Sequence, residues 1–309
     1  MDKITLKSPA KINLCLSVLG KRPDGYHEVE MLMQMVGLYD EVTVALSKKN
    51  ITIKCDNAAV PDGEKNIAWK AAWEMLKAVG SKAGLTVDIK KNIPVAAGLG
   101  GGSGNAAAVL AAANRLLNAG FDRKQLADTG ARIGMDVPFF FYGPTALARG
   151  RGEILTPLPP IPQCWVLLVN PGFETSTAWV YNNISLRLTK KVDCNKIARL
   201  KVRNIAQRLH NDLKTVTTVA HPVIGEIEAA LITHGALGAS MSGSGPTVFG
   251  MFETEAACRA AADGLSQERW RIYPVATLTE SPIQQQLTEM DVPSARGGSG
   301  SDRDRNCTA

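Results

Sequence analysis

Several features are missing from this 309-residue sequence, and each absence excludes a class of protein. No apolar run approaches the roughly 18 residues that a membrane-spanning helix requires. Met1-Asp2-Lys3 leads directly into strand-like alternation, so we expect no signal peptide. Apolar residues make up 45% and charged residues 21% of the chain, which excludes wholesale disorder and collagen-like repeats.

Cysteine is sparse and scattered. The chain has six cysteines, no two of them within four residues of each other: Cys15, Cys55, Cys164, Cys194, Cys258 and Cys307. This spacing matches neither a zinc site nor a dense disulfide framework. We therefore expect reduced thiols and a cytoplasmic location.

Positive charge is concentrated in one segment. The net charge is +6, and residues 187–203 alone hold seven basic side chains and one acid, Asp193. A nucleic-acid arm is one interpretation, but the segment has no aromatic side chain for stacking bases and no known motif. A solvated basic surface beside an anionic small-molecule site fits as well. We expect neither a nucleic acid nor a membrane as partner.

Hydrophobic periodicity predicts mixed strands and helices throughout the chain. Alternation over the first 55 residues is typical of strands, and Asn66 can cap a helix that ends at Gly80. An apolar helix is expected over residues 105–117 and another over 123–133. In the second half the pattern predicts strands near 164–169, 239–241, 247–252 and 273–278, and helices near 176–182, 222–233 and 255–265. The fold class is therefore α+β.

Four prolines within residues 157–162 mark the clearest boundary, because such a run cannot continue a helix or a central strand. We expect an N-terminal domain over residues 1–157 and a C-terminal domain over 158–283. Residues 284–309 end in a Gly/Ser and Asp/Arg-rich stretch, which predicts a disordered tail. Everything after Ser281 should then be dispensable.

The strongest local signal is a glycine-rich loop between a strand and a buried helix. Its residues are Pro94, Val95, Ala96, Ala97, Gly98, Leu99, Gly100, Gly101, Gly102, Ser103 and Gly104. Free backbone N–H groups and the positive end of the helix dipole make such a loop suited to polyphosphate. It is neither a Walker A loop nor a dinucleotide fingerprint. A flexible turn that needs only positive φ is the alternative.

Three further segments are candidates with an ordinary explanation beside each. Lys11 and Asn13 share the strand face opposite Ile12 and Leu14, although such a pair is most often a solvated face. Asp136 directly precedes the apolar run 137–141, where burying an unpaired carboxylate would be costly, so its position needs an explanation. The ordinary explanation is that Asp136 caps a helix or a turn. A second glycine-rich run over 238–246 is either a ligand loop or a tight strand turn.

These segments, in this order, resemble the galactokinase–homoserine kinase–mevalonate kinase–phosphomevalonate kinase (GHMP) superfamily. Within this superfamily, the residues of the motifs resemble those of the 4-diphosphocytidyl-2-C-methyl-D-erythritol kinases, ATP-dependent enzymes of the non-mevalonate isoprenoid pathway. The matching motifs are Pro9-Ala-Lys-Ile-Asn13, Asp24-Gly-Tyr-His27, Gly98-Leu-Gly-Gly-Gly-Ser103, Asp136-Val-Pro-Phe-Phe140, Asn211-Asp-Leu213 and Ser240-Met-Ser-Gly-Ser-Gly-Pro246. The Asp-Gly-Tyr-His element is the specific one, and the resemblance runs from about Lys3 to Leu278.

The resemblance implies a fold and a set of roles. It implies a ribosomal-protein-S5-domain-2-like ATP domain followed by a ferredoxin-like domain, with Lys11 and Asp136 as the catalytic pair. The loop 94–104 would hold ATP. Substrate-binding residues would be Asn13, Tyr26, His27, Tyr181, Ser242 and Gly243, with Tyr26 and Tyr181 stacking the cytosine, His27 bonding its edge and the loop 240–246 near the diphosphate.

Two positions depart from the family pattern. Gly104 follows Ser103 where relatives usually have a second hydroxyl residue, so we assign no protein ligand to Mg²⁺ and expect the ion to rest on phosphate oxygens and water. Met33 stands where we expect an aromatic side chain, which would loosen the base pocket. The remaining alternatives are another kinase of the superfamily, acting on mevalonate, homoserine or a sugar, and a non-catalytic nucleotide-binding protein. A monomer and a homodimer both remain open.

Overall fold

A computed structural model describes residues 2–186 and 192–291 of the chain. The first half alternates long strands with a helical layer. Its elements are β1 (Lys3–Lys21), β2 (His27–Ser47), β3 (Ile51–Cys55), η1 (Gly63–Lys65), α1 (Ile67–Ala78), β4 (Gly84–Lys90), α2 (Gly101–Leu116), α3 (Arg123–Ile133), α4 (Phe139–Tyr142), β5 (Thr145–Arg149) and β6 (Ile154–Leu158).

The second half carries shorter elements. They are β7 (Trp165–Asn170), α5 (Thr177–Asn183), α6 (Cys194–Ile197), α7 (Val202–Ala206), β8 (His210–Asn211), α8 (Lys214–Ala220), α9 (Val223–Thr233), β9 (Gly238–Met241), β10 (Val248–Phe252), α10 (Glu255–Gly264), β11 (Arg271–Ala276) and α11 (Pro282–Asp291). This α+β pattern is the one that periodicity predicts.

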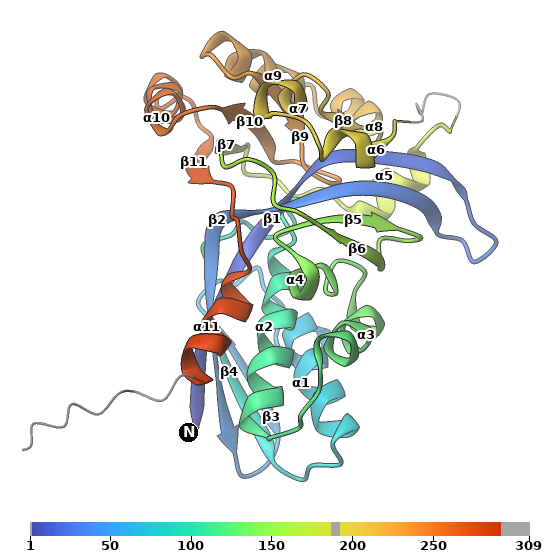
Figure 1. Cartoon of the computed structure of the whole chain (residues 1–309), viewed down its shortest axis with the longest axis vertical. Coiled ribbons are helices and arrows are strands. Elements are labelled where there is room, and N and C mark those ends of the chain that lie inside the picture. Colours follow the sequence, from blue (N-terminus) through green and yellow to red (C-terminus); the bar gives the residue numbers. More distant parts are fainter. Residues whose placement is uncertain (1, 187–191, 292–309) are drawn as a thin grey trace, which may run out of the picture.

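The long hairpin β1–β2 extends through both halves of the molecule. Its two antiparallel strands have 19 and 21 residues, and Figure 1 shows them running from the lower helical half into the upper half. Periodicity alone suggests several shorter strands here. They are continuous because the pairing tolerates register shifts at Pro9/Ala10, Asn13/Cys15 and Val18/Gly20. Such irregularities bend a strand and re-aim side chains, and two of them flank Lys11 and Asn13.

The strands form two sheets. The larger sheet has seven strands in the order β3-β4-β2-β1-β8, with β5 pairing with β2 and β6 with β5. The smaller sheet has four antiparallel strands in the order β11-β7-β10-β9. An isolated bridge between Val36 of β2 and Thr277, together with the β1–β8 pairing, joins the two halves.

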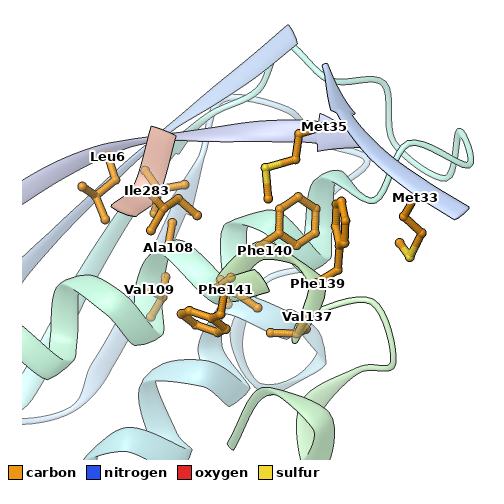
Figure 2. Packing of buried hydrophobic residues seen from close by; sticks show 14 of the residues in the cluster. Leu6, Met33, Met35, Ala108, Val109, Val137, Phe139, Phe140, Phe141 and Ile283 are labelled. Carbon is orange, nitrogen blue, oxygen red and sulfur yellow. The ribbon is translucent and has the colours of Figure 1, made fainter. Parts of the chain in front are cut away.

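Helix α2 fills the centre of the first half. Its sequence is rich in alanine, and residues 104–113 are all buried, so other elements can pack against it on nearly every side. Helices α1 and α3 pack beside it (Figure 1). The aromatic run Phe139–Phe141 lies buried between α2 and β2, close to Met35 (Figure 2). This core fixes the positions of the glycine-rich loop at one end of α2 and of Asp136, three residues before the run.

The C-terminal segment departs from the expected tail. Residues 282–291 form α11, which packs against β1 and α4 with Ile283 fully buried. The Lys7 N–H donates to Gln286 Oε1 at 2.8 Å, and Ser281 Oγ donates to the Phe140 carbonyl at 3.4 Å. The prediction of disorder from residue 284 is therefore wrong up to 291. Residues 292–309, the rest of the expected tail, lie outside the described part of the chain.

The cysteines also depart from expectation, because Cys15 of β1 and Cys194 of α6 form a disulfide across 179 residues. Cys55, Cys164 and Cys258 are free. The prediction of reduced thiols is thus wrong for one pair. Within residues 2–186 and 192–291, no helix is long and apolar enough to cross a membrane.

Candidate active site

A cavity of about 880 Å³ opens between the glycine-rich loop, the end of the β1–β2 hairpin turn and α5. This size is in the range typical of small-molecule sites. Of the residues predicted as site residues, those that line it are Lys11, Asn13, Tyr26, His27, Pro94 to Ser103, Asp136, Tyr181 and Gly243. The chain thus brings segments from positions 11 to 243 together around one space.

The glycine-rich loop needs its glycines. Gly98 and Gly100 have φ of 75° and 68°, which L side chains adopt rarely. A Cβ on Gly98 would lie 2.0 Å from the Ser242 carbonyl oxygen, and one on Gly100 would lie 2.8 Å from Lys11 Cγ. The alternative of a merely flexible turn does not explain these contacts. The loop is packed on two neighbours and leads into α2 at Gly101, whose first N–H groups have no partner within the helix.

Lys11 is the link between the loop and the carboxylate. Its side chain is 5% exposed, and Nζ donates to Asn13 Oδ1 at 2.8 Å and to the Gly98 carbonyl at 3.0 Å. The same Nζ lies 3.5 Å from Asp136 Oδ2. The predicted shared face of Lys11 and Asn13 is confirmed, and the solvated-face interpretation is not, since both side chains are buried.

Asp136 lies in the turn between α3 and α4. The three phenylalanines after it are buried and fix the turn, whereas the Asp136 side chain remains 29% exposed towards the cavity. The carboxylate therefore has a cationic partner and an open side. It can accept a hydrogen bond from a ligand hydroxyl without leaving Lys11.

The second glycine-rich run braces the first. Ser242 Oγ donates to the Gly98 carbonyl at 2.9 Å and accepts from the Asn13 N–H at 3.3 Å. Ser242 is fully buried and does not line the cavity, unlike its neighbours Gly243 and Ser244. The structure thus places it as a brace between loops rather than at the cavity surface.

The structure gives a role to Asn211, the first residue of the motif Asn211-Asp-Leu213, to which the sequence analysis assigned none. Its Nδ2 donates to the carbonyls of Met241 and Gly243 at 2.7 and 2.8 Å, and its Oδ1 accepts from the Leu213 N–H at 3.0 Å. The two bonds that Nδ2 donates hold the second loop, and the bond that Oδ1 accepts fixes the local turn after β8. Such a role could be suspected from an Asn beside glycine-rich runs, but the partner cannot be read from spacing.

The two tyrosines and the histidine form the aromatic part of the cavity wall. The rings of His27 and Tyr181 have centroids 5.2 Å apart and are tilted by 31°. Tyr26 is 52% exposed, and its ring lies 4.9 Å from the guanidinium carbon of Arg151. Each tyrosine therefore has a different neighbour, and both line the cavity.

Burial shifts the pKa values of two of these wall residues, His27 and Tyr181. It lowers the pKa of His27 below its ordinary value of 6.5, with a smaller contribution from the positive charge of Lys21. Burial, and then the negative charge of Asp136, raises the pKa of Tyr181 far above 10. At neutral pH the site therefore presents a neutral imidazole, with one donor and one acceptor nitrogen, and a neutral phenol.

Met33 does not line this pocket. It is fully buried in the core behind the wall, where it pairs with Asn13, and the loosening of the pocket stays a prediction. Met31, two residues earlier on the same strand face, does line the cavity, and its Sδ accepts from Asn13 Nδ2 at 3.5 Å.

Several wall residues were not predicted. Lys91 forms an ion pair with Asp40, and both side chains are almost completely buried. Asp40 Oδ1 also accepts from the N–H groups of Asn92 and Ile93 at 2.8 and 2.9 Å, which fixes the strand entering the glycine-rich loop. Other unpredicted wall residues are Lys65, Asn66, Ile67, Asn105, Arg151, Thr175, Ser176 and Thr177. They come from separate elements, so no local pattern marks them.

Comparison with known proteins assigns the fold. Residues 66–144 match the family model described as GHMP kinases N terminal domain, and residues 196–272 match GHMP kinases C terminal. A solved homoserine kinase from Cytophaga hutchinsonii is similar in fold, with a TM-score of 0.70 at 22% identity over 91% of this chain and 96% of that one. The expected two-domain GHMP architecture is confirmed.

Nearer relatives narrow the assignment. The 4-diphosphocytidyl-2-C-methyl-D-erythritol kinase of Pelobacter propionicus is 50% identical over 90% of this chain and 100% of its own length, and that of Geobacter metallireducens is 48% identical over the same shares. A crystal structure of a 4-(cytidine 5'-diphospho)-2C-methyl-D-erythritol kinase has a TM-score of 0.77 at 32% identity, covering 89% of this chain and 99% of that one. The chain therefore belongs to the 4-diphosphocytidyl-2-C-methyl-D-erythritol kinase family of GHMP kinases.

Proposed function

We propose that this chain transfers the γ-phosphoryl group of ATP to the 2-hydroxyl of 4-diphosphocytidyl-2-C-methyl-D-erythritol, a step of the non-mevalonate isoprenoid pathway. The observation that carries the proposal is the position of Lys11 Nζ, 3.0 Å from the Gly98 carbonyl and 3.5 Å from Asp136 Oδ2. One ammonium group thus connects a phosphate-binding loop to a carboxylate, which is the arrangement that phosphoryl transfer to an alcohol requires.

In this reaction Asp136 orients the acceptor hydroxyl and accepts its proton. Lys11 holds the carboxylate in place through its positive charge and stabilises negative charge that develops on the transferred group. Asn13, whose Oδ1 already accepts from Lys11 Nζ, faces the same end of the cavity and binds the hydroxyl end of the substrate. These roles are proposals drawn from residue chemistry and position.

The loop 94–104 binds the ATP phosphates through its N–H groups and the N-terminus of α2. Beyond Gly101 the cavity continues to Asn66, Ile67 and Lys91, which we expect to face the rest of the nucleotide. We place the ATP-binding and catalytic role in residues 1–157 and the substrate-side role in 158–283, with Asn13, Tyr26 and His27 of the first domain completing the substrate site.

The residues around the loop fit a Mg²⁺ ion that is held mainly by phosphate oxygens. Asn105 is 4% exposed and lines the cavity, and its Oδ1 is buried without a hydrogen-bond partner. A neutral carboxamide oxygen is a ligand that Mg²⁺ accepts alongside phosphates and water. Among residues 2–186 and 192–291, no group of three or more His, Cys, Asp and Glu side chains is arranged as a metal site. When bound, the ion would neutralise charge on the β- and γ-phosphates.

The pyrimidine end of the substrate fits the pocket of Tyr26, His27 and Tyr181. Aromatic rings stack a base, and the neutral imidazole of His27 can bond its edge. Gly243 and Ser244 line the wall between this pocket and Lys11, which supports a contact with the diphosphate. A cytoplasmic location stays a prediction, and the Cys15–Cys194 disulfide removes the reduced-thiol argument for it.

A substrate panel tests the proposal. The purified chain is given ATP and Mg²⁺ with 4-diphosphocytidyl-2-C-methyl-D-erythritol, with mevalonate, with homoserine and with no acceptor, and ADP release is measured. We expect turnover with the diphosphocytidyl substrate alone. Turnover with another alcohol in its place would assign a different kinase activity, and no turnover with any acceptor would assign a non-catalytic nucleotide-binding role.

A further inference from the structure

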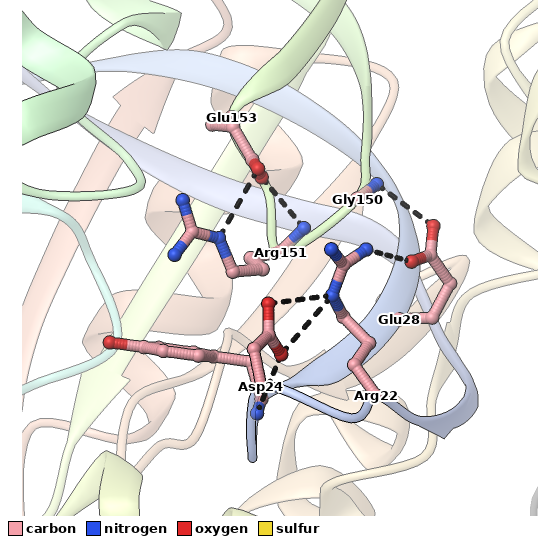
Figure 3. Close-up of polar contacts among 7 residues, drawn as sticks. Arg22, Asp24, Glu28, Gly150, Arg151 and Glu153 are labelled. Atoms are coloured by element: carbon pink, nitrogen blue, oxygen red, sulfur yellow. Dashed lines mark hydrogen bonds and ion pairs between the residues drawn. The ribbon is translucent and has the colours of Figure 1, made fainter.

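A cationic side chain that the mechanism does not use lies against the pyrimidine pocket. Arg151 follows β5 in the turn before β6 and lines the cavity beside Tyr26 and His27. Its guanidinium carbon is 4.9 Å from the centroid of the Tyr26 ring, a cation–π distance. Figure 3 shows Arg151 beside Glu153, with Gly150 and Glu28 nearby.

Glu153 fixes the conformation of Arg151. Its Oε2 accepts from the Arg151 backbone N–H at 2.7 Å, and its Oε1 accepts from Arg151 Nε at 3.2 Å. Figure 3 shows the two terminal nitrogens of the guanidinium directed away from Glu153. Because an arginine side chain loses considerable rotamer freedom when it is fixed, a carboxylate that bonds both its backbone and its side chain is a device for orientation.

A second carboxylate joins this turn to the one that carries Tyr26. Glu28 Oε1 accepts from the Gly150 N–H at 3.2 Å, and Glu28 Oε2 accepts from Arg22 Nη1 at 2.6 Å. Asp24 in turn accepts from Arg22 Nε at 3.2 Å and from the Tyr26 N–H at 3.1 Å. The chain of contacts, drawn in Figure 3, connects the backbone of Tyr26 to the backbone beside Arg151.

Stability does not explain this network. The side chains of Arg22, Asp24 and Glu28 are between 34% and 42% exposed, and ion pairs at such positions contribute little to folding. What the network does achieve is a fixed relation between two surface turns at the rim of the cavity. Tyr26 needs such help because its side chain is half exposed, and Arg151 lies over its ring.

We propose that Arg151 is a positioning residue that holds the Tyr26 ring ready to stack a pyrimidine nucleotide, with Glu153 fixing Arg151 in turn. The guanidinium covers one face of the ring and leaves the other face for the base. A ring ordered before binding loses less freedom on binding, so Arg151 improves affinity for the cytidine substrate and not the chemical step. The inference rests on the proposed function and concerns its specificity.

The test is a double-mutant cycle in the full-length chain. Arg151→Gln removes the charge and keeps most of the side-chain volume, and Tyr26→Leu removes the ring. We expect Arg151→Gln to raise KM for the diphosphocytidyl substrate about 3- to 10-fold, the range of an exposed to partly buried cation–π contact. We expect kcat and KM for ATP to change less than about twofold. The double variant should bind no worse than Tyr26→Leu alone, because Arg151 acts through Tyr26.

Two further variants separate positioning from a general structural role. Arg149→Gln is the matched control, since Arg149 is the last residue of β5, two residues before Arg151, pairs with Glu30 at 2.9 Å and does not line the cavity. Arg151→Lys should raise KM for the diphosphocytidyl substrate less than Arg151→Gln does, because an ammonium also interacts with the ring. It should not reach the wild-type KM, because it lacks the Nε bond to Glu153. Melting temperatures of all variants are measured alongside.

The outcomes are distinct. A wild-type chain without activity on the diphosphocytidyl substrate overturns the proposed function. If the wild type is active, the positioning role alone is overturned by any of three results. These are an unchanged KM in Arg151→Gln, an effect of Arg151→Gln that adds to that of Tyr26→Leu, or the same effect in Arg149→Gln. An increase in KM that disappears in the Tyr26→Leu background supports it.

Discussion

Ser242 Oγ donates a hydrogen bond to the carbonyl oxygen of Gly98 at 2.9 Å, across 144 residues of sequence. This bond joins the second glycine-rich loop to the phosphate-binding loop. The same hydroxyl accepts from the Asn13 N–H at 3.3 Å, so one buried side chain connects both loops to β1. The relative positions of Lys11, Gly98 and the substrate-side loop therefore depend on a residue that does not line the cavity.

Ser242→Ala should lower both stability and activity. The substitution leaves a buried N–H and part of a carbonyl without a partner, which costs about 1–3 kcal/mol. We expect a lower melting temperature and a lower kcat/KM for both substrates, measured by thermal unfolding and steady-state kinetics. Ser266→Ala is the control, because Ser266 Oγ bonds the Asp263 carbonyl at an exposed helix end. Equal behaviour of the two variants would contradict the bracing role.

Asp136→Asn should abolish phosphoryl transfer while the fold and ATP binding persist. Removing one general base typically reduces the rate about 10²- to 10⁴-fold. The measurement is turnover at saturating substrates, together with ATP affinity and the melting temperature. Asp128→Asn serves as a control, since Asp128 forms an exposed pair with Lys124 on α3. Near wild-type turnover of Asp136→Asn would restore the turn-capping interpretation of this residue.

Local signals in the sequence predict the elements well. The helix expected over 123–133 has those bounds in α3, with Asp122 and Gln125 forming a capping box. Asn66 caps α1 as predicted, by accepting from the Ala68 N–H at 2.8 Å. Such elements follow from periodicity and capping within a dozen residues, which is information that a short window contains.

Contacts between distant segments are what the sequence does not reveal. The Cys15–Cys194 disulfide, the buried Lys91–Asp40 pair and the Arg151–Tyr26 contact join residues that are 51 to 179 positions apart. Spacing carries no information about these pairings. Family motifs mark Lys11 and Asp136, whereas no motif marks Asp40, Lys91 or Arg151.

Helix α11 is a different kind of failure. Pro282 at its first position, followed by Ile283 and Leu287 four residues apart, is a helix signal that the composition of the following Gly/Ser-rich stretch obscured. Ile283→Ala should therefore destabilise the fold by about 2–5 kcal/mol, the range for a fully buried isoleucine. Thermal unfolding checks this, with the exposed Thr288→Ala as control. An unchanged melting temperature would return α11 to the status of a dispensable segment.

The lowered pKa of His27 predicts a direction for pH dependence. Since burial disfavours the charged imidazole, the unfolded chain takes up a proton at this residue at higher pH than the folded chain does. The contribution to stability is present above pH 6.5 and is lost as pH falls towards the lower folded pKa. Melting temperatures between pH 7.5 and 5.5 should decrease less for His27→Gln than for the wild type. A steeper decrease of the melting temperature in His27→Gln than in the wild type would contradict this direction.

The last prediction concerns how the pocket distinguishes cytidine from uridine. Stacking on Tyr26 and Tyr181 contributes roughly 1–3 kcal/mol per ring, but it is the same for either pyrimidine. Discrimination must come from hydrogen bonds, because cytosine offers an amino donor and a ring-nitrogen acceptor where uracil offers the reverse. A neutral His27 packed on the Tyr181 ring has a fixed orientation from which to read that edge.

We therefore expect the uridine analogue to be a poor substrate, because a mismatched edge leaves polar groups unpaired in the pocket. His27→Ala should narrow the cytidine-to-uridine ratio of kcat/KM, and Tyr181→Ala should weaken both analogues to a similar extent. The comparison needs only the two analogues and the three proteins under one set of conditions. An unchanged ratio in His27→Ala would show that His27 supports Tyr181 structurally and that other groups read the base.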